Sequence, residues 1–135
     1  MSIFGCYIIL KKTNLIERVC QSNVTVILNA YRRPYNLKMQ IEAIRNQTIP
    51  PKQIWLWINK HQDNDGFDFD SLNVDRIFHN DYNWKFYGRF AAALLADTEY
   101  VALYDDDTIP GSQWHENCLQ TVSYTHLTLP TILLV

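Results

Sequence analysis

Three short runs of apolar or β-branched residues, each followed at once by polar side chains, set the strongest limit on how this chain folds. The runs cover residues 24–28, 54–58 and 100–104. Unbroken runs of this length are typical of strands that are buried on both faces of a sheet. A weaker run at residues 74–78 predicts one further short strand.

Two stretches between these runs have the spacing of amphipathic helices, over residues 35–47 and 84–96, and a last helix is expected from about residue 113. The apolar stripes expected on the first two helices are Leu37, Ile41 and Ile44, and Phe86, Phe90 and Leu94. Strands that alternate with helices in this way predict an α/β fold, with a mostly parallel sheet flanked by helices.

Polar segments follow three of the expected strands, at residues 29–33, 59–65 and 105–107. In open α/β sheets, ligands bind outside the carboxyl ends of the strands. The sequence therefore predicts a binding site where these three segments meet.

The third segment is a run of three carboxylates, Asp105, Asp106 and Asp107. Side chains alternate along an extended backbone, so Asp105 and Asp107 are expected on one side and Asp106 on the other. Three adjacent carboxylates repel one another, and a divalent cation with a preference for oxygen ligands, Mg²⁺ or Mn²⁺, would relieve that repulsion. The alternative is an acidic turn that is solvated at the end of its strand.

Four segments in this order, VTVILNAYRRP, IWLWIN, FYGRFAAALLADTEY and VALYDDDTIPG, resemble the nucleotide-sugar-binding half of GT-A glycosyltransferases. The similarity is to family-2-like enzymes, and the second strand and the Arg-Phe helix are also similar to the exostosin-like transferases. The resemblance covers residues 24–122 and ends after the aspartates. It implies a Rossmann-like fold and identifies the aspartate triplet as a DxD motif.

The resemblance also implies a role for each candidate residue. Asp107 would bind a Mn²⁺ or Mg²⁺ ion that bridges the donor diphosphate, with Asp105 as a second candidate ligand that also lies near the ribose or sugar. Asp106 could contribute to either. The remaining donor-binding candidates are Asn29, Ala30, Tyr31 and Arg32 in a loop that cradles the nucleoside, Arg89 for the diphosphate or sugar, and Asn59 for the base. For Arg89, a surface salt bridge is the competing interpretation, and for Arg32 a solvated loop position.

The implied activity is metal-dependent transfer of a sugar, with a UDP-sugar favoured as donor, to a glycan, lipid or protein acceptor. No general base can be assigned, and Glu116, Asp81 and His79 are interpreted as structural. One alternative is a truncated chain that binds the donor without turnover. A nucleotidyltransferase is the other, and it is disfavoured because residues 29–34 contain no glycine.

The chain is expected to hold one nucleotide-sugar-binding domain at residues 24–121, after an N-terminal extension at residues 1–23. Residues 122–135 lose charge abruptly and are interpreted as a tail that is not native to the protein. A net charge of −2 gives no reason to expect a nucleic-acid partner. The apolar stretch at residues 3–10 is too short to span a bilayer, and a cytoplasmic location is expected.

Overall fold

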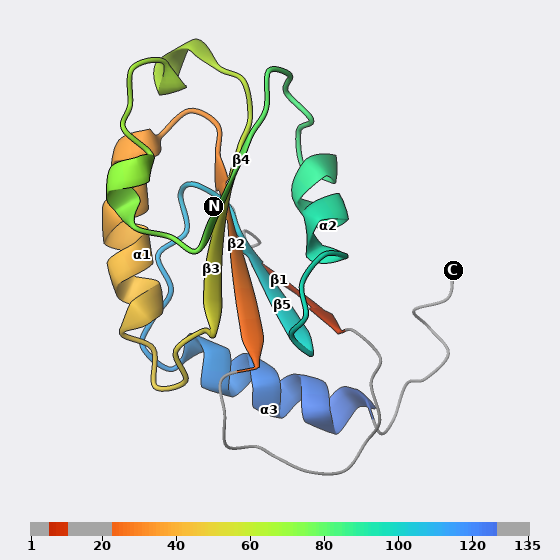
Figure 1. The fold of residues 1–135 in the computed structure, drawn as a ribbon. Helices are drawn as coiled ribbons and strands as arrows, with labels where there is room; N and C mark the ends of the chain where they lie inside the picture. Colours follow the sequence, from red (N-terminus) through yellow and green to blue (C-terminus); the bar gives the residue numbers. More distant parts are fainter. Residues whose placement is uncertain (1–5, 11–22, 127–135) are drawn as a thin grey trace.

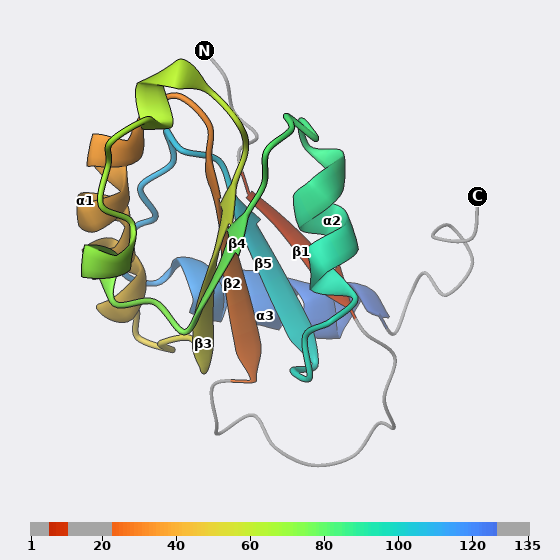
Figure 2. The ribbon, with the colours of Figure 1, turned by 45° about the horizontal axis from the view of Figure 1, so that its top comes forward.

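A computed structural model describes residues 6–10 and 23–126, which form one five-stranded sheet in the order β1-β5-β2-β3-β4. Its strands are β1 (Cys6–Leu10), β2 (Val24–Ala30), β3 (Gln53–Ile58), β4 (Arg76–His79) and β5 (Tyr100–Tyr104). The last four run parallel, and β1 lies antiparallel beside β5 (Figure 2). The predicted α/β fold with a mostly parallel sheet is confirmed, and its organisation is Rossmann-like.

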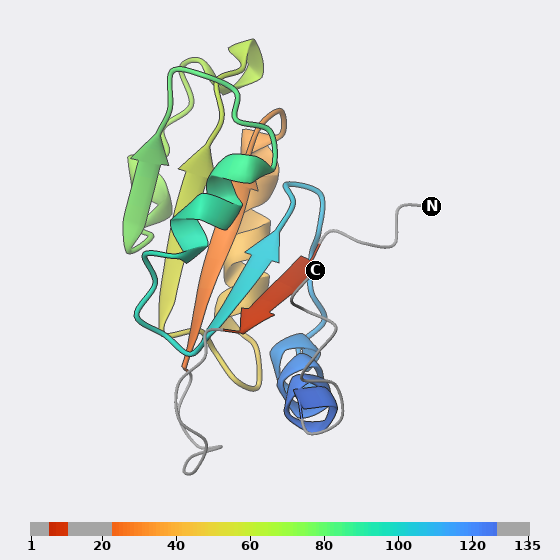
Figure 3. The same cartoon turned by 90° about the vertical axis from the view of Figure 1, so that its right-hand side faces the viewer.

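Two helical connections place α1 (Leu37–Arg45) and α2 (Tyr87–Ala93) on opposite faces of the sheet (Figures 1 and 3). The chain passes from β2 through α1 to β3 on one side, and from β4 through α2 to β5 on the other side of β2. The strand order therefore reverses between β2 and β5, which is where such sheets bind ligands. The remaining elements are the 3-10 turns η1 (Pro34–Asn36), η2 (Gln62–Asn64) and η3 (Asp70–Leu72), and the helix α3 (Trp114–His126).

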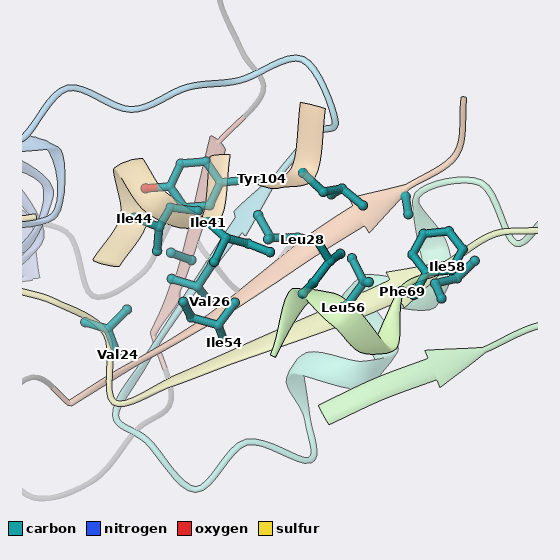
Figure 4. Close-up of a cluster of buried hydrophobic side chains, with 14 residues drawn as sticks. Val24, Val26, Leu28, Ile41, Ile44, Ile54, Leu56, Ile58, Phe69 and Tyr104 are labelled. Carbon is teal, nitrogen blue, oxygen red and sulfur yellow. The ribbon is translucent and has the colours of Figure 1, made fainter. Parts of the chain in front are cut away.

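Aliphatic side chains fill the space between the sheet and α1 (Figure 4). The expected stripe on α1 is fully enclosed: Leu37, Ile41 and Ile44 are all buried. They share one cluster with alternate residues of the central strands, such as Leu28 and Leu56. Burial of each such side chain contributes roughly 1.5–3 kcal/mol, so this face is the main source of stability.

On the opposite face, the predicted stripe of α2 is confirmed at Phe90, which packs against the core, and is wrong at its other two positions. Phe86 is 49% exposed and Leu94 is 75% exposed. Apart from Arg89, the buried residues of this region are small, and Ala92, Ala93 and Ala96 share a cluster with Trp55. The bulky rings come from the strands, so the helix has to present small side chains to approach them.

Gly88 shows how close this approach is. A Cβ atom built on Gly88 would lie 2.1 Å from Cζ2 of Trp57. Trp55 and Trp57 therefore pack under α2 as part of the core, which agrees with their expected position on one face of the strand.

Described elements lie on both sides of the expected domain limits at residues 24 and 121. Residues 6–10 form β1, although the sequence predicts no strand within the N-terminal extension. Helix α3 continues to His126, across the expected boundary at residue 122. Residues 127–135 lie outside the described part. Among the described residues, no helix is both long enough and apolar enough to span a membrane.

Candidate functional site

A pocket of about 350 Å³ opens at the carboxyl ends of the central strands, on the α2 face of the sheet. The lining residues are Asn29, Tyr31, Asn59, Asn83, Lys85, Phe86, Arg89 and Asp105. Five of them are among the predicted site residues, and they come from the ends of β2, β3 and β5 and from α2. A second hollow of about 410 Å³, lined in part by Pro50 and Asp75, contains none of the predicted residues.

Arg89 and Asp105 form an ion pair in the wall of this pocket, in which the Arg89 side chain is buried and the Asp105 side chain is 30% exposed. Arg89 is 4% exposed, so the competing interpretation of a surface salt bridge does not apply. Its Nη1 also donates to the Tyr104 carbonyl oxygen at 3.4 Å, and its Nε has no acceptor among the described residues. The pair brings together two residues that are 16 positions apart and fixes α2 to the end of β5.

Asp106 faces the other way and connects two loops. Its carboxylate accepts a hydrogen bond from the Arg32 backbone N–H at 3.1 Å and lies 3.5 Å from Arg33 Nη1. The Arg32 side chain is exposed and its Nε lies 3.9 Å from Asp63 Oδ2. In this structure Asp106 and Arg32 therefore join the first polar segment to the third, and neither lines the pocket.

Asp107 is the most accessible carboxylate of the triplet, with its side chain 54% exposed. It pairs with Arg33 Nη1 at 3.3 Å, whereas Asp105 pairs with Arg89. The shared orientation expected for Asp105 and Asp107 is therefore not found, because the chain turns after β5 instead of remaining extended.

The triplet does not form a cation cage, since no three acidic, histidine or cysteine side chains converge within the described part of the chain. A cation that takes most of its ligands from a substrate diphosphate and from water needs only one or two carboxylates. Asp107 fits that requirement, because its exposed carboxylate contacts only the half-exposed Arg33 and, at 3.5 Å, the Thr108 hydroxyl among the described residues.

Amide side chains of α1 and its flanks bind the backbone of the aspartate loop. Gln40 Nε2 donates to the carbonyl oxygens of Asp105 at 2.5 Å and of Thr108 at 2.6 Å. Asn36 donates to the Asp106 carbonyl at 3.3 Å, and Gln47 to that of Gly111 at 2.6 Å. None of these residues is among those predicted from the sequence. Gln40 could have been recognised from the sequence, because it is a polar residue within the apolar stripe of an amphipathic helix.

Asn59 is a structural junction, and its expected role with the base is revised. Its Nδ2 donates to Asn29 Oδ1 and to the Lys85 carbonyl, both at 3.0 Å. Its Oδ1 accepts from Trp57 Nε1 and from the Trp84 backbone N–H, both at 3.1 Å. An amide can make four such bonds, and all four are used in a residue that is 1% exposed. No donor or acceptor remains for a ligand.

The end of β2 and the loop after it contribute residues both to the structure and to the pocket. Ala30 is fully buried, and its carbonyl accepts from the Asn59 backbone N–H at 2.9 Å. Tyr31 lies on the pocket wall, with its ring in edge contact with His61 at 4.8 Å between centroids. Asn29 also lines the pocket, so Asn29 and Tyr31 are the residues of this segment that a ligand can meet.

The connection between β4 and α2 supplies the three lining residues that are not predicted from the sequence, Asn83, Lys85 and Phe86. Lys85 adopts a positive φ of 53°. Its backbone N–H donates to Asn83 Oδ1 at 2.8 Å, and its carbonyl accepts from Asn59. The contribution of this connection depends on a turn that no local motif in the sequence marks.

Candidates for acid–base chemistry lie elsewhere. Glu116 accepts a hydrogen bond from the Thr48 hydroxyl at 2.9 Å, and neither Asp81 nor His79 lines the pocket. His115 is buried at the start of α3, where desolvation lowers its pKa. Its Nδ1 lies 3.0 Å from the Ile49 carbonyl oxygen, away from the pocket residues. These placements agree with structural roles.

No known protein family matches this sequence, and no curated protein matches it either.

Proposed function

We propose that this domain binds a nucleotide-diphosphate sugar together with Mn²⁺ or Mg²⁺, as the donor-binding half of a GT-A-type glycosyltransferase. One observation carries the proposal. Asn29, Tyr31, Arg89 and Asp105 come from separate elements and line a single pocket at the carboxyl ends of the strands. Asp107, the accessible carboxylate, follows two residues after Asp105.

Each of these side chains has chemistry that suits a part of such a donor. The Tyr31 ring offers a stacking face for a base, and Asn29 offers an amide beside it. Arg89, oriented by Asp105, places a guanidinium in the wall where phosphate oxygens would lie. A pocket of about 350 Å³ is within the range of small-ligand sites.

Asp107 would hold the cation, and Asp105 would hold Arg89 in place. A bound divalent cation would act as a Lewis acid on the departing diphosphate. Asp106, tied to the loop after β2, would keep the two loops at a fixed separation.

The pocket residues support donor binding more directly than turnover. Asp105 is the one carboxylate among the described lining residues, and it is already paired with Arg89. An inverting transfer needs a base to deprotonate the acceptor hydroxyl. These residues alone are therefore expected to bind a UDP-sugar without transferring it, and hydrolysis and transfer assays on the 135-residue chain would test that expectation.

Calorimetric titration of UDP and GDP with and without Mn²⁺ tests the proposal. Asp107→Asn is expected to weaken metal-dependent UDP binding by about tenfold or more, since one charged metal ligand is lost. Asp97→Asn is the matched control, because Asp97 is an exposed aspartate that precedes β5 at the opposite edge of the sheet. Binding that ignores the metal, or that Asp107→Asn leaves unchanged, would show that the metal site is assigned wrongly.

A further inference from the structure

Lys85 is held in a conformation that lysine rarely adopts. Its φ of 53° lies in the left-handed region, where the Cβ atom of an L-residue is crowded. Asn83 Oδ1 accepts its backbone N–H at 2.8 Å, and the buried Asn59 donates to its carbonyl at 3.0 Å. Strained positions of this kind are concentrated at ligand-binding sites, where the surrounding structure enforces them.

The charges in the pocket wall do not cancel. Lys85, Arg89 and Asp105 are the charged lining residues, and Asp105 already compensates Arg89. No carboxylate among the described residues forms an ion pair with the Lys85 ammonium, whereas the nearby Lys60 pairs with Asp65 at 3.1 Å. The pocket therefore keeps one positive charge in a protein whose net charge is −2.

The buried Arg89 guanidinium holds the second polar group in this pocket that lacks a partner within the described part of the chain. Arg89 Nε is enclosed and has no acceptor among the described residues, although the side chain lines the same pocket as Lys85. Buried donors without a partner are uncommon in native structures and call for an explanation. An anion in this pocket would compensate the ammonium and, after a small shift of Arg89, accept from Nε.

We infer that Lys85 is the anion-binding residue of this pocket, and that it binds the diphosphate of the ligand beside Arg89. The identification of that diphosphate as part of a nucleotide rests on the proposed function, whereas the anion site itself does not. Asn83 and Asn59 act as positioning residues, because they hold the backbone that carries the ammonium. Lys85 would compensate the negative charge of the phosphate oxygens that a cation at Asp107 does not bind.

Titrations of inorganic pyrophosphate, UDP and uridine into wild type and Lys85→Gln test this inference. The substitution is expected to weaken pyrophosphate and UDP by about tenfold or more while uridine affinity stays the same, since only the phosphates meet the ammonium. Lys85→Arg should restore most of the lost affinity. Lys52→Gln is the matched control, because Lys52 is exposed and precedes β3 at the opposite edge of the sheet.

Lys85→Gly separates binding from folding. Glycine adopts a positive φ without crowding, and both backbone hydrogen bonds remain available. The melting temperature of Lys85→Gly is therefore expected to equal or exceed that of wild type, while pyrophosphate affinity falls as in Lys85→Gln. A purely structural role for Lys85 would not produce this combination.

The outcomes distinguish the two proposals. Wild-type pyrophosphate affinity that Lys85→Gln does not change overturns the Lys85 assignment, even if Asp107→Asn abolishes metal-dependent UDP binding. Loss of pyrophosphate binding in Lys85→Gln supports the assignment, even if UDP binding proves independent of metal. A wild-type protein that binds neither anion overturns both.

Discussion

The two faces of the sheet are built on different principles. The α1 face is filled by aliphatic side chains, and buried amides such as Gln40 bind the backbone there. On the α2 face, small helix residues pack against Trp55, and Arg89 and Asp105 form a charged pair. Five of the eight pocket-lining residues were predicted from the sequence, and the pocket opens on the α2 face.

The α1 face therefore contributes mainly to the stability of the fold, and the α2 face contributes the side chains of the candidate site. Burial of aliphatic surface is favourable wherever it occurs, whereas enclosing a charge pair costs desolvation free energy that its mutual attraction only partly offsets. Burial of aliphatic side chains on the α1 face can therefore offset the desolvation free energy of the charge pair on the α2 face. The backbone of the aspartate loop is fixed from the α1 side, and its Asp105 side chain is used on the α2 side.

Ile44→Ala should have the largest effect, because it opens a cavity in the face that stabilises the fold. Ile44 is fully buried against the sheet. Substitutions of this kind cost about 2–5 kcal/mol of unfolding free energy. Chemical denaturation measures the loss. Leu94→Ala, on the stripe expected to be buried on α2 but found 75% exposed, should change stability by less than about 0.5 kcal/mol. Equal losses in the two variants would contradict the comparison.

Gly88→Ala tests the close packing of the α2 face. The added methyl group would lie 2.1 Å from the Trp57 ring, so the helix has to shift. Overpacking is expected to cost about 1–3 kcal/mol, and the shift should also weaken UDP binding because Arg89 lies on the same helix. Thermal melting and titration measure both effects. Gly111→Ala, whose new methyl group would meet nothing within 4 Å, is the control. A variant as stable as wild type would show that α2 is not packed this closely.

The smallest expected effect is the pH dependence due to His115, which is buried on the α1 side with its ring 6.1 Å from that of Tyr104. Desolvation lowers its pKa in the folded protein, so below the unfolded pKa of about 6.5 the unfolded chain binds more protons. Its contribution to stability is present above that pH and is lost as the pH falls.

Melting temperatures at about pH 7.5 and 5.5 measure this dependence, in a window above the usual pKa values of carboxylates. Wild type should lose more stability over the window than His115→Gln, which cannot take up the proton. The same loss in both proteins would assign the pH dependence to other groups.

The sequence predicts one face of the molecule better than the other. The strand at residues 100–104 was predicted with its observed bounds, and the stripe of Leu37, Ile41 and Ile44 was confirmed, because each depends on the local spacing of apolar residues. The stripe expected on α2 holds only at Phe90, because Trp55 and Trp57, far away in the chain, fill the space beneath that helix. Local hydrophobicity cannot reveal a partner of this kind.

The candidate site was also predicted in part, where topology alone decides, and missed where contacts between distant residues decide. The strand-end rule placed Asn29, Asn59 and Asp105 together, since it depends only on the topology of a parallel sheet. It could not show that all four hydrogen-bonding positions of Asn59 are used, because its partners include the backbone of Trp84 and Lys85. The strand β1 was also missed, since its pairing with β5 depends on contacts between distant residues.

The hydrogen bonds from Asn36, Gln40 and Gln47 to the carbonyls of residues 105–111 decide what could be transplanted from this protein. The loop keeps its shape because α1 and the residues that flank it, 64 to 70 positions earlier in the chain, supply its donors. Grafted alone onto another α/β scaffold, the aspartates would lose those donors and their geometry with them. The transferable unit is the loop together with α1, including one glutamine on the buried side of that helix.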